Sequence, residues 1–144
     1  MASASPGDRS TALDSAQPHR RTRADHASET AEDYVEAMVD LADPEGGCRV
    51  VDLAEHFGVS HVTVIRILKR LESEGLVVRR PYQPVRLTDE GRKLAEASAE
   101  RHRVVFAFLR KLGVNATTAA VDAEGIEHHL SEPTLKAMRK FLSS

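Results

Sequence analysis

Residues 53–60 read LAEHFGVS, and the small and turn-forming positions of this stretch each have a structural purpose. Ala54 is small, so two crossing helices can approach closely at this point. Gly58 adopts the left-handed conformation of a tight turn at little cost, and Val59 is expected to fill the corner. Ser60 can accept a hydrogen bond from a free backbone N–H of the following helix. The stretch therefore predicts two helices joined by a tight turn.

The flanking sequence extends this pair of helices. Upstream, apolar periodicity predicts a helix from about residue 30 to 42, and residues 49–51 predict a short strand before the helix at 52–57. Downstream, a third helix has apolar residues at helical spacing, namely Val64, Ile67, Leu68 and Leu71.

Two β-branched runs, at residues 76–80 and 85–87, then flank the turn sequence PYQP and predict a β-hairpin. Helix, turn, helix and hairpin follow one another in this order in a winged helix-turn-helix. The second helix of that motif commonly enters the major groove of DNA.

The remainder of the chain is helical. Residues 88–112 predict a long helix, about 115–129 a second and 131–142 a third. The fold class is thus mainly α, with an N-terminal winged helix-turn-helix and its hairpin wing at residues 29–90 and a helical region at residues 91–144. Residues 1–28 are polar without apolar periodicity and predict a disordered tail, whose arginines either touch DNA phosphates or, more simply, stay solvated.

Composition excludes several classes of protein. The chain has 144 residues, 41% of them hydrophobic, and no run approaches the roughly 20 apolar residues of a membrane helix. A single cysteine, Cys48, excludes a disulfide framework and a zinc finger, and the absence of an apolar leader predicts a cytoplasmic protein. Only 4% of residues are aromatic, which disfavours binding of single strands by base stacking.

Charge is unevenly distributed along the chain. Residues 29–45 contain seven acids and no Lys or Arg, whereas residues 60–93 contain eight basic residues against four acids, a net charge of +4. The basic block suits a polyanion, and the acidic block suits a cation.

The basic block indicates double-stranded DNA as the partner, although a solvated charged helix in a protein-binding winged helix is the alternative. The start of the third helix is expected to meet base edges, and the later positions and the wing are expected to neutralise phosphates. The predicted DNA-binding residues are Ser60, His61, Thr63, Arg66, Lys69, Arg70, Arg79 and Arg80.

Two further groups have the spacing of metal ligands. Asp33 and Glu36 are three residues apart on the first predicted helix. Glu124, Glu127 and His128 share one face of a later helix, while the next histidine in sequence, five residues after Glu124, points about 140° away. An ordinary exposed helix face is the alternative for each group. Gly125 inside the second group costs about 1 kcal/mol relative to Ala, which suggests a local reason for that sequence.

Three motifs, EDYVE at 32–36, RH at 101–102 and DAEGIEHHLS at 122–131, resemble the manganese transport regulators. These are the manganese-sensing branch of the diphtheria-toxin-repressor-like metalloregulators. The resemblance covers about residues 30–142 and implies that residues 91–144 serve metal binding and dimerisation. It implies a pair of Mn(II) ions per subunit held by Asp33, Glu36, His102, Glu124, Glu127 and His128.

The resemblance also implies the function. A homodimer loaded with Mn(II) binds a palindromic operator and represses manganese uptake genes, with no membrane and no organic cofactor involved. Asp33 and Glu124 stand where the iron-sensing branch has sulfur ligands, and carboxylates suit the harder Mn²⁺.

Two alternatives belong to other classes. One is a metal-independent winged-helix regulator that answers an organic ligand or a redox signal through Cys48. The other is a dimanganese hydrolase, in which the metals activate water. The sequence shows no acid, base or nucleophile beyond the expected ligands, so we expect that the protein is not an enzyme.

Overall fold

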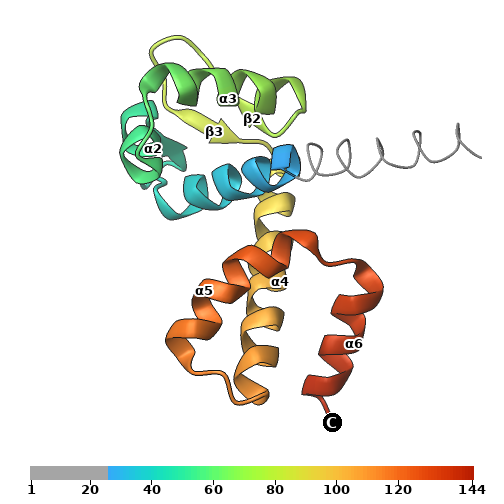
Figure 1. Cartoon of the computed structure of the whole chain (residues 1–144). Coiled ribbons are helices and arrows are strands. Elements are labelled where there is room, and N and C mark those ends of the chain that lie inside the picture. The colour runs from blue at the N-terminus through green and yellow to red at the C-terminus, as the bar shows by residue number, and fades with distance from the viewer. Residues whose placement is uncertain (1–25) are drawn as a thin grey trace, which may run out of the picture.

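The computed structural model describes residues 26–144, which form two lobes joined by a long helix, α4 (Asp89–Lys111) (Figure 1). The expectations for residues 1–25, including the arginines at 20, 21 and 23, lie outside the described residues. The first described helix spans residues 26–40, so residues 26–28, which the sequence analysis placed in the tail, are helical.

The N-terminal lobe, which is the upper one in Figure 1, is a winged helix-turn-helix, as predicted. After the first helix come β1 (Gly47–Cys48), α2 (Val50–Phe57), α3 (His61–Ser73), β2 (Val77–Val78) and β3 (Val85–Leu87). The strands form an antiparallel sheet in the order β1-β3-β2.

The prediction of a strand at residues 49–51 was wrong. The strand lies at Gly47–Cys48, where it pairs with β3, and α2 already begins at Val50. Arg49 is the extended residue before the helix. Val50 and Val51 were read as strand residues, but they form the first turn of α2, where Val50 packs against the core and Val51 is 47% exposed. Local β-preference is overridden by the tertiary context.

The turn between α2 and α3 has the predicted chemistry at Gly58 and Ser60. Gly58 has a φ of 64°, and the Ser60 hydroxyl accepts a hydrogen bond from the backbone N–H of Thr63 at 3.2 Å. Val59, however, is 37% exposed and does not fill the corner. Its backbone N–H donates to the carbonyl of Ala54 at 3.0 Å, so the backbone itself closes the turn.

The lower lobe contains most of α4 together with α5 (Ala116–Ile126), a 3₁₀ turn η1 (Glu127–His129) and α6 (Glu132–Leu142). The predicted helix over 115–129 therefore stops as an α-helix at Ile126 and tightens into η1. Thr88 caps α4 by accepting from the N–H of Gly91 at 3.1 Å. A Cβ at Gly91 would lie 2.1 Å from the carbonyl oxygen of Leu76, so the start of α4 is packed directly against the upper lobe.

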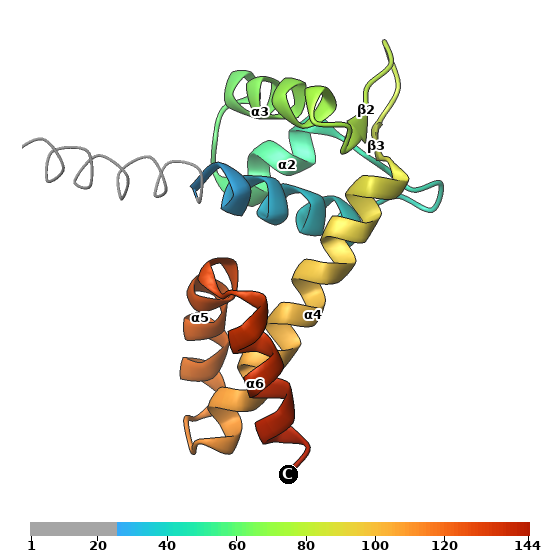
Figure 2. The ribbon, with the colours of Figure 1, turned by 90° about the vertical axis from the view of Figure 1, so that its right-hand side faces the viewer.

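The described residues form two hydrophobic clusters, one in each lobe. The upper cluster includes Tyr34, Leu53, Val64 and Leu68, and the lower includes Val105 and Leu135. Figure 2 shows the first helix along the underside of the upper lobe, facing the lower lobe. None of the helices in residues 26–144 is long and apolar enough to cross a membrane.

Candidate metal centre and DNA-reading surface

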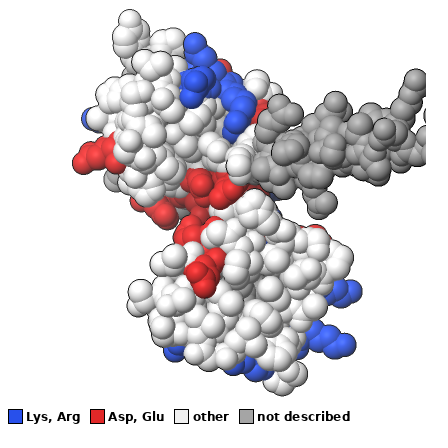
Figure 3. Space-filling model, in the orientation of Figure 1, with Lys and Arg blue, Asp and Glu red and all other residues white. Residues whose placement is uncertain are grey.

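Acidic side chains gather at the waist between the two lobes, whereas Lys and Arg side chains lie on the upper lobe and along the outer part of the lower one (Figure 3). Three elements meet at the waist: the first helix, the middle of α4, and the end of α5 with η1. The segments that supply these side chains lie far apart in sequence.

His128 lies at the centre of the waist with its side chain only 1% exposed. Its Nε2 atom is 3.2 Å from Oδ1 of Asp33 and 3.6 Å from Oε1 of Glu127. Its Nδ1 atom is 2.5 Å from Oε2 of Glu32. One ring nitrogen therefore faces a buried supporting carboxylate, and the other faces two of the predicted ligands.

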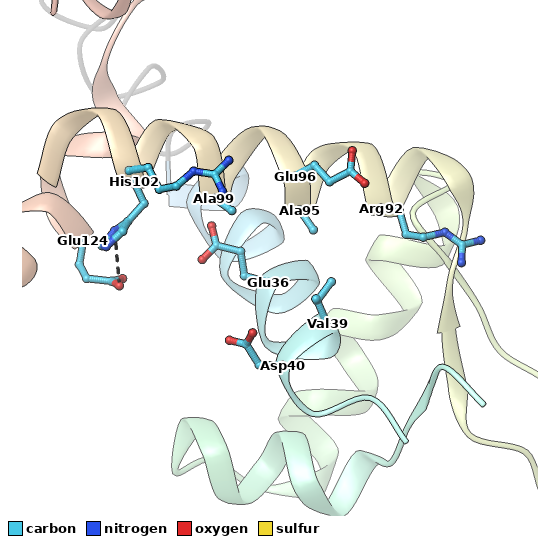
Figure 4. Close-up of a pocket in the computed structure, with 10 residues that line it drawn as sticks. Glu36, Val39, Asp40, Arg92, Ala95, Glu96, Ala99, His102 and Glu124 are labelled. Carbon is cyan, nitrogen blue, oxygen red and sulfur yellow. Dashed lines mark ion pairs between the residues drawn. The ribbon is translucent and has the colours of Figure 1, made fainter. Parts of the chain in front are cut away.

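His102 extends the cluster from α4. Its Nδ1 atom is 2.8 Å from Oε2 of Glu127 and 3.8 Å from Oε1 of Glu124. Glu36 accepts a hydrogen bond from the Ser98 hydroxyl on α4. Figure 4 shows Glu36, His102 and Glu124 around one side of a cavity of about 480 Å³ that they help to line.

The carboxylates of the cluster lie close together in a partly buried environment, which shifts the pKa values of several of its residues. Burial, together with the negative charge of Glu36, raises the pKa of Glu127 to about 7 against the favourable effect of the nearby histidines. Burial likewise raises the pKa of Glu36, and the Ser98 hydrogen bond opposes that shift. Hydrogen bonds to Asp33 and Glu32 raise the pKa of His128 to about 10.

One buried oxygen of this cluster is unpaired. Oε1 of Glu127 has no hydrogen-bond partner although the residue is 1% exposed. Buried polar atoms are nearly always paired, and an unpaired one costs about 1–3 kcal/mol. A divalent cation among these oxygen and nitrogen donors would satisfy this atom and neutralise the neighbouring carboxylates, so the donor set fits such an ion.

The structure brings all six predicted metal ligands into this one cluster. The geometric reason given for the C-terminal three was only partly right, because Glu127 and His128 lie in η1 and not on a continuous α-helix. Glu127 is buried, whereas the side chain of Glu124 is 64% exposed. His129 lies outside the six-residue cluster, with its side chain 47% exposed and its Nε2 atom 3.5 Å from Oε2 of Glu29.

Glu32 and Arg101 are the supporting residues that sequence reasoning missed. Oε1 of Glu32 is 2.9 Å from Nη2 of Arg101, and its other oxygen faces His128. Glu32 therefore connects the first helix to both α4 and η1. The sequence signal was an acid next to Asp33 on the apolar side of the helix, but its burial depends on partners 69 and 96 residues away.

The predicted DNA-binding residues occupy one end and one side of α3 and the wing. His61, Arg66, Lys69 and Arg80 are exposed, and Thr63 and Arg79 are half-buried. The backbone N–H of Arg79 donates to Glu72 of α3 at 3.2 Å, which ties the wing to that helix.

Arg70 has a different environment from its neighbours. Its Nη2 atom donates to the backbone carbonyl of Ala27 at 2.9 Å, and its Nε atom lies 3.6 Å from Glu74. Its guanidinium thus connects α3 to the first helix. Val62, which was not among the predicted residues, is 76% exposed beside His61 in the first turn of α3.

Cys48 is buried at 1% exposure, and burial raises the pKa of its thiol to about 11. The thiolate is the reactive form of cysteine, so this residue has the character of a packed, unreactive thiol and gives no support to a redox signal.

Comparisons with known proteins agree with this architecture. Residues 26–85 match the family model described as iron dependent repressor, N-terminal DNA binding domain, and residues 88–144 match iron dependent repressor, metal binding and dimerisation domain. The transcriptional regulator MntR of Escherichia coli O6:H1 is 49% identical over 122 residues, which cover 85% of this chain and 79% of that protein. The HTH-type transcriptional regulator MntR of Geobacillus thermodenitrificans is 37% identical, covering 69% and 71%.

Solved structures give the same result. The manganese regulator SloR superposes with a TM-score of 0.67 at 29% identity, covering 78% of this chain and 53% of that one. A manganese-dependent transcriptional repressor in complex with manganese superposes with a TM-score of 0.67 at 30% identity, covering 78% and 52%. The chain spans about half the length of these solved structures.

A winged helix-turn-helix joined to a metal-binding and dimerisation region defines a metal-dependent transcriptional repressor that binds DNA and forms dimers. The chain belongs to the iron-dependent repressor family and, within it, to the manganese regulators of the diphtheria-toxin-repressor type. This is a family of regulators and not of enzymes, so neither the dimanganese hydrolase nor the metal-independent regulator is supported.

Proposed function

We propose that this protein is a transcriptional regulator that responds to manganese. It acts in the cytoplasm, takes up two Mn(II) ions per subunit, binds a palindromic operator as a homodimer and represses manganese uptake genes. The described residues divide into a DNA-reading domain at 26–90, which includes residues 26–28 because they belong to the first helix, and a metal-binding and dimerisation region at 91–144. The observation that carries the proposal is the buried, unpaired Oε1 of Glu127 at the centre of the six-residue cluster.

The chemistry of the donors supports manganese. The six proposed ligands, Asp33, Glu36, His102, Glu124, Glu127 and His128, include four carboxylates and no sulfur. Oxygen-rich sites suit hard divalent ions such as Mn²⁺, and sulfur favours softer metals. Two of the superposed structures are described as a manganese regulator and as a manganese-dependent repressor in complex with manganese, which points the same way.

The position of the cluster supports a mechanical link between metal and DNA. Asp33 and Glu36 lie on the first helix, which packs in the core of the DNA-reading lobe, and Glu127 and His128 lie in η1, directly after α5, in the other lobe. A bound divalent ion supplies the positive charge that lets these carboxylates stay ionised side by side. With their repulsion removed, the residues hold the two lobes in one relative orientation and lower the ordering cost of DNA binding.

The exposed face of α5 supports the dimer. Val121 is 68% exposed and Ile126 is 37% exposed, while a Cβ added at Gly125 would meet nothing within 4 Å in the subunit. This glycine is therefore not required by packing within one chain. We place a second copy against this face, where the missing side chain permits close approach of the partner helix.

The exposed surface of α3 supports operator reading. Ser60, His61, Thr63 and Arg66 lie in its first turns and are assigned to base edges and nearby backbone. Lys69, Arg79 and Arg80 are assigned to phosphates, together with Arg70 as far as its contact with Ala27 allows.

The test is a titration of labelled operator DNA, taken from upstream of a manganese transporter gene, with and without Mn²⁺ at one fixed salt concentration. We expect Mn²⁺ to tighten binding by a factor in the range of about 5 to 150, the usual scale of coupling between two sites. Salt is held constant because phosphate contacts make affinity steeply salt-dependent. Equal affinity in both conditions would refute manganese control and leave the DNA-reading fold standing.

A further inference from the structure

Glu29 is an acidic residue of the first helix that lies outside the six proposed ligands. It precedes Asp33 by four residues, which places the two carboxylates on the same side of the helix. One ligand atom each from Glu29, Asp33 and His128 lie within 4.8 Å of one another. These three residues thus form a compact set of donors at the outer edge of the cluster.

A second observation points to a cation next to these donors. The unpaired Oε1 of Glu127 is buried and lies 3.6 Å from Nε2 of His128, the ring nitrogen that also faces Asp33. Nδ1 of the same ring is already used by Glu32. An ion bound at Nε2 of His128 would therefore lie close to the carboxylates of Asp33, Glu127 and Glu29.

Glu29 also contacts His129 of η1. Its Oε2 atom is 3.5 Å from Nε2 of His129, and both side chains are partly exposed, at 31% and 47%. Contacts of this kind between partly exposed side chains contribute little to stability. The contact with His129 is therefore weak enough for the Glu29 carboxylate to bind an ion instead.

We propose that Glu29 is an additional carboxylate ligand of the metal ion held by Asp33 and His128, and that it raises the oxygen content of that position. This inference rests on the proposed function, since it adds a donor to the same metal centre. A further hard donor favours the six-coordinate oxygen-rich geometry of Mn²⁺ over the four-coordinate geometry common for Zn²⁺.

The test compares the full-length wild-type protein, stripped of metal, with three variants. Glu29→Ala removes the proposed ligand at a helical position that tolerates Ala well. Asp40→Ala is the matched control, because it removes one exposed carboxylate from the same helix, one turn beyond Glu36. His129→Ala removes the neighbour of Glu29 and leaves the carboxylate in place.

Two readouts are measured. Mn²⁺ affinity is obtained from the paramagnetic resonance signal of the free aqueous ion. Co²⁺ is used as a spectroscopic probe, since its visible absorption strengthens when the coordination number falls. In Glu29→Ala we expect the Kd for Mn²⁺ to rise about tenfold, toward the lower end of what loss of a metal-supporting side chain costs. We expect stronger Co²⁺ absorption in this variant and values near wild type for Asp40→Ala and His129→Ala.

The alternative outcomes separate the two proposals. Wild-type affinity and an unchanged Co²⁺ spectrum in Glu29→Ala would overturn the role of Glu29 and leave the metal centre intact. An equal loss in Asp40→Ala would show a general charge effect, and an equal loss in His129→Ala would show an effect of the ion pair; either result overturns direct ligation. A wild-type protein that binds no Mn²⁺ would overturn both this inference and the proposed function.

Discussion

The DNA-reading surface and the metal centre are built in opposite ways. On α3 the exposed residues follow one another within a few turns, and the serine that begins the helix is bonded to a residue three positions later. At the waist, Glu32 meets His128 from 96 residues away, and Glu36 meets Ser98 from 62 residues away. The first surface is a product of local sequence, and the second exists only when the two lobes come together.

This difference explains how a metal can control the protein. A surface made by one helix and its turn keeps its shape whatever the lobes do. A cluster shared between lobes depends on their relative position, and anything that stabilises the cluster also fixes that position. Mutations at the waist are therefore expected to impair the response to metal, and mutations on α3 are expected to impair DNA reading, each without the other.

The largest effect is expected from His128→Ala. This ring faces Asp33, Glu127 and Glu32 at once, so its loss removes the buried contacts of η1 with Asp33 and Glu32 of the first helix. The gain in operator affinity on adding Mn²⁺, about 5- to 150-fold in the wild type, should disappear while metal-free binding persists. A titration of operator DNA measures both. His129→Ala is the control, and a loss as large in that variant would refute the assignment of the two histidines.

Arg66→Ala should impair the DNA-reading surface. Arg66 is exposed on α3 and makes no contact with the waist that the structure records. We expect a loss of about 1–3 kcal/mol in specific operator binding, with Mn²⁺ affinity unchanged. Binding isotherms on the operator and on a scrambled duplex measure the loss of specificity. Lys69→Ala provides the contrast, since a phosphate contact should weaken both duplexes alike and reduce the salt slope by about 1.

Glu32→Gln tests whether Glu32 supports the metal centre at the waist, because it keeps the size of the side chain and removes its charge. Glu32 holds Nδ1 of His128 and Nη2 of Arg101, so the histidine loses the partner that orients it. We expect Mn²⁺ affinity to fall about tenfold, and calorimetric titration would show it. The matched change Glu100→Gln alters a partly exposed acid of α4 paired with Arg103 and should have no effect; a comparable loss there would contradict the specific role of Glu32.

The smallest and most gradual effect is the pH dependence of the metal-free protein. The pKa of Glu127 is raised to about 7 and that of His128 to about 10, so in both cases the folded state binds more protons than the unfolded chain. The free energy of unfolding should therefore fall as pH rises, from about 4.5 to 7 through Glu127 and from about 6.5 to 10 through His128. Urea denaturation at several pH values measures this trend.

Metal affinity should follow pH in the opposite direction, since ligation requires the deprotonated carboxylate and imidazole. Mn²⁺ affinity is expected to increase over the same pH range in which metal-free stability decreases. A metal affinity independent of pH would argue against Glu127 and His128 as ligands.

The sequence predicted the two helices around Gly58, the cap at Ser60, the wing and the extent of α4 correctly. Each depends on interactions within a few residues, so a linear pattern contains the necessary information. The strand at residues 49–51 was misplaced, and the end of α5 was missed. In both places β-branched or helix-forming residues are directed by tertiary packing, which overrides local preference.

For the site, sequence analysis named six residues but not their arrangement. Spacing along a helix nominated Glu124, Glu127 and His128, and resemblance supplied their roles. Neither showed that Glu127 is buried with one oxygen unpaired, nor that Glu32 and Arg101 support His128. These facts depend on burial and on contacts between distant segments.

What this chain's sequence determined by itself is therefore its set of helices, their caps and turns, and the chemical types of its exposed side chains. Those features arise from backbone preferences and hydrogen bonds between near neighbours. Only the tertiary structure decided which acids meet at the waist, which of them lose contact with water, and that His128 lies beside Glu29 and Asp33. The physical reason is that desolvation and charge crowding depend on distances through space, which are set when the lobes pack.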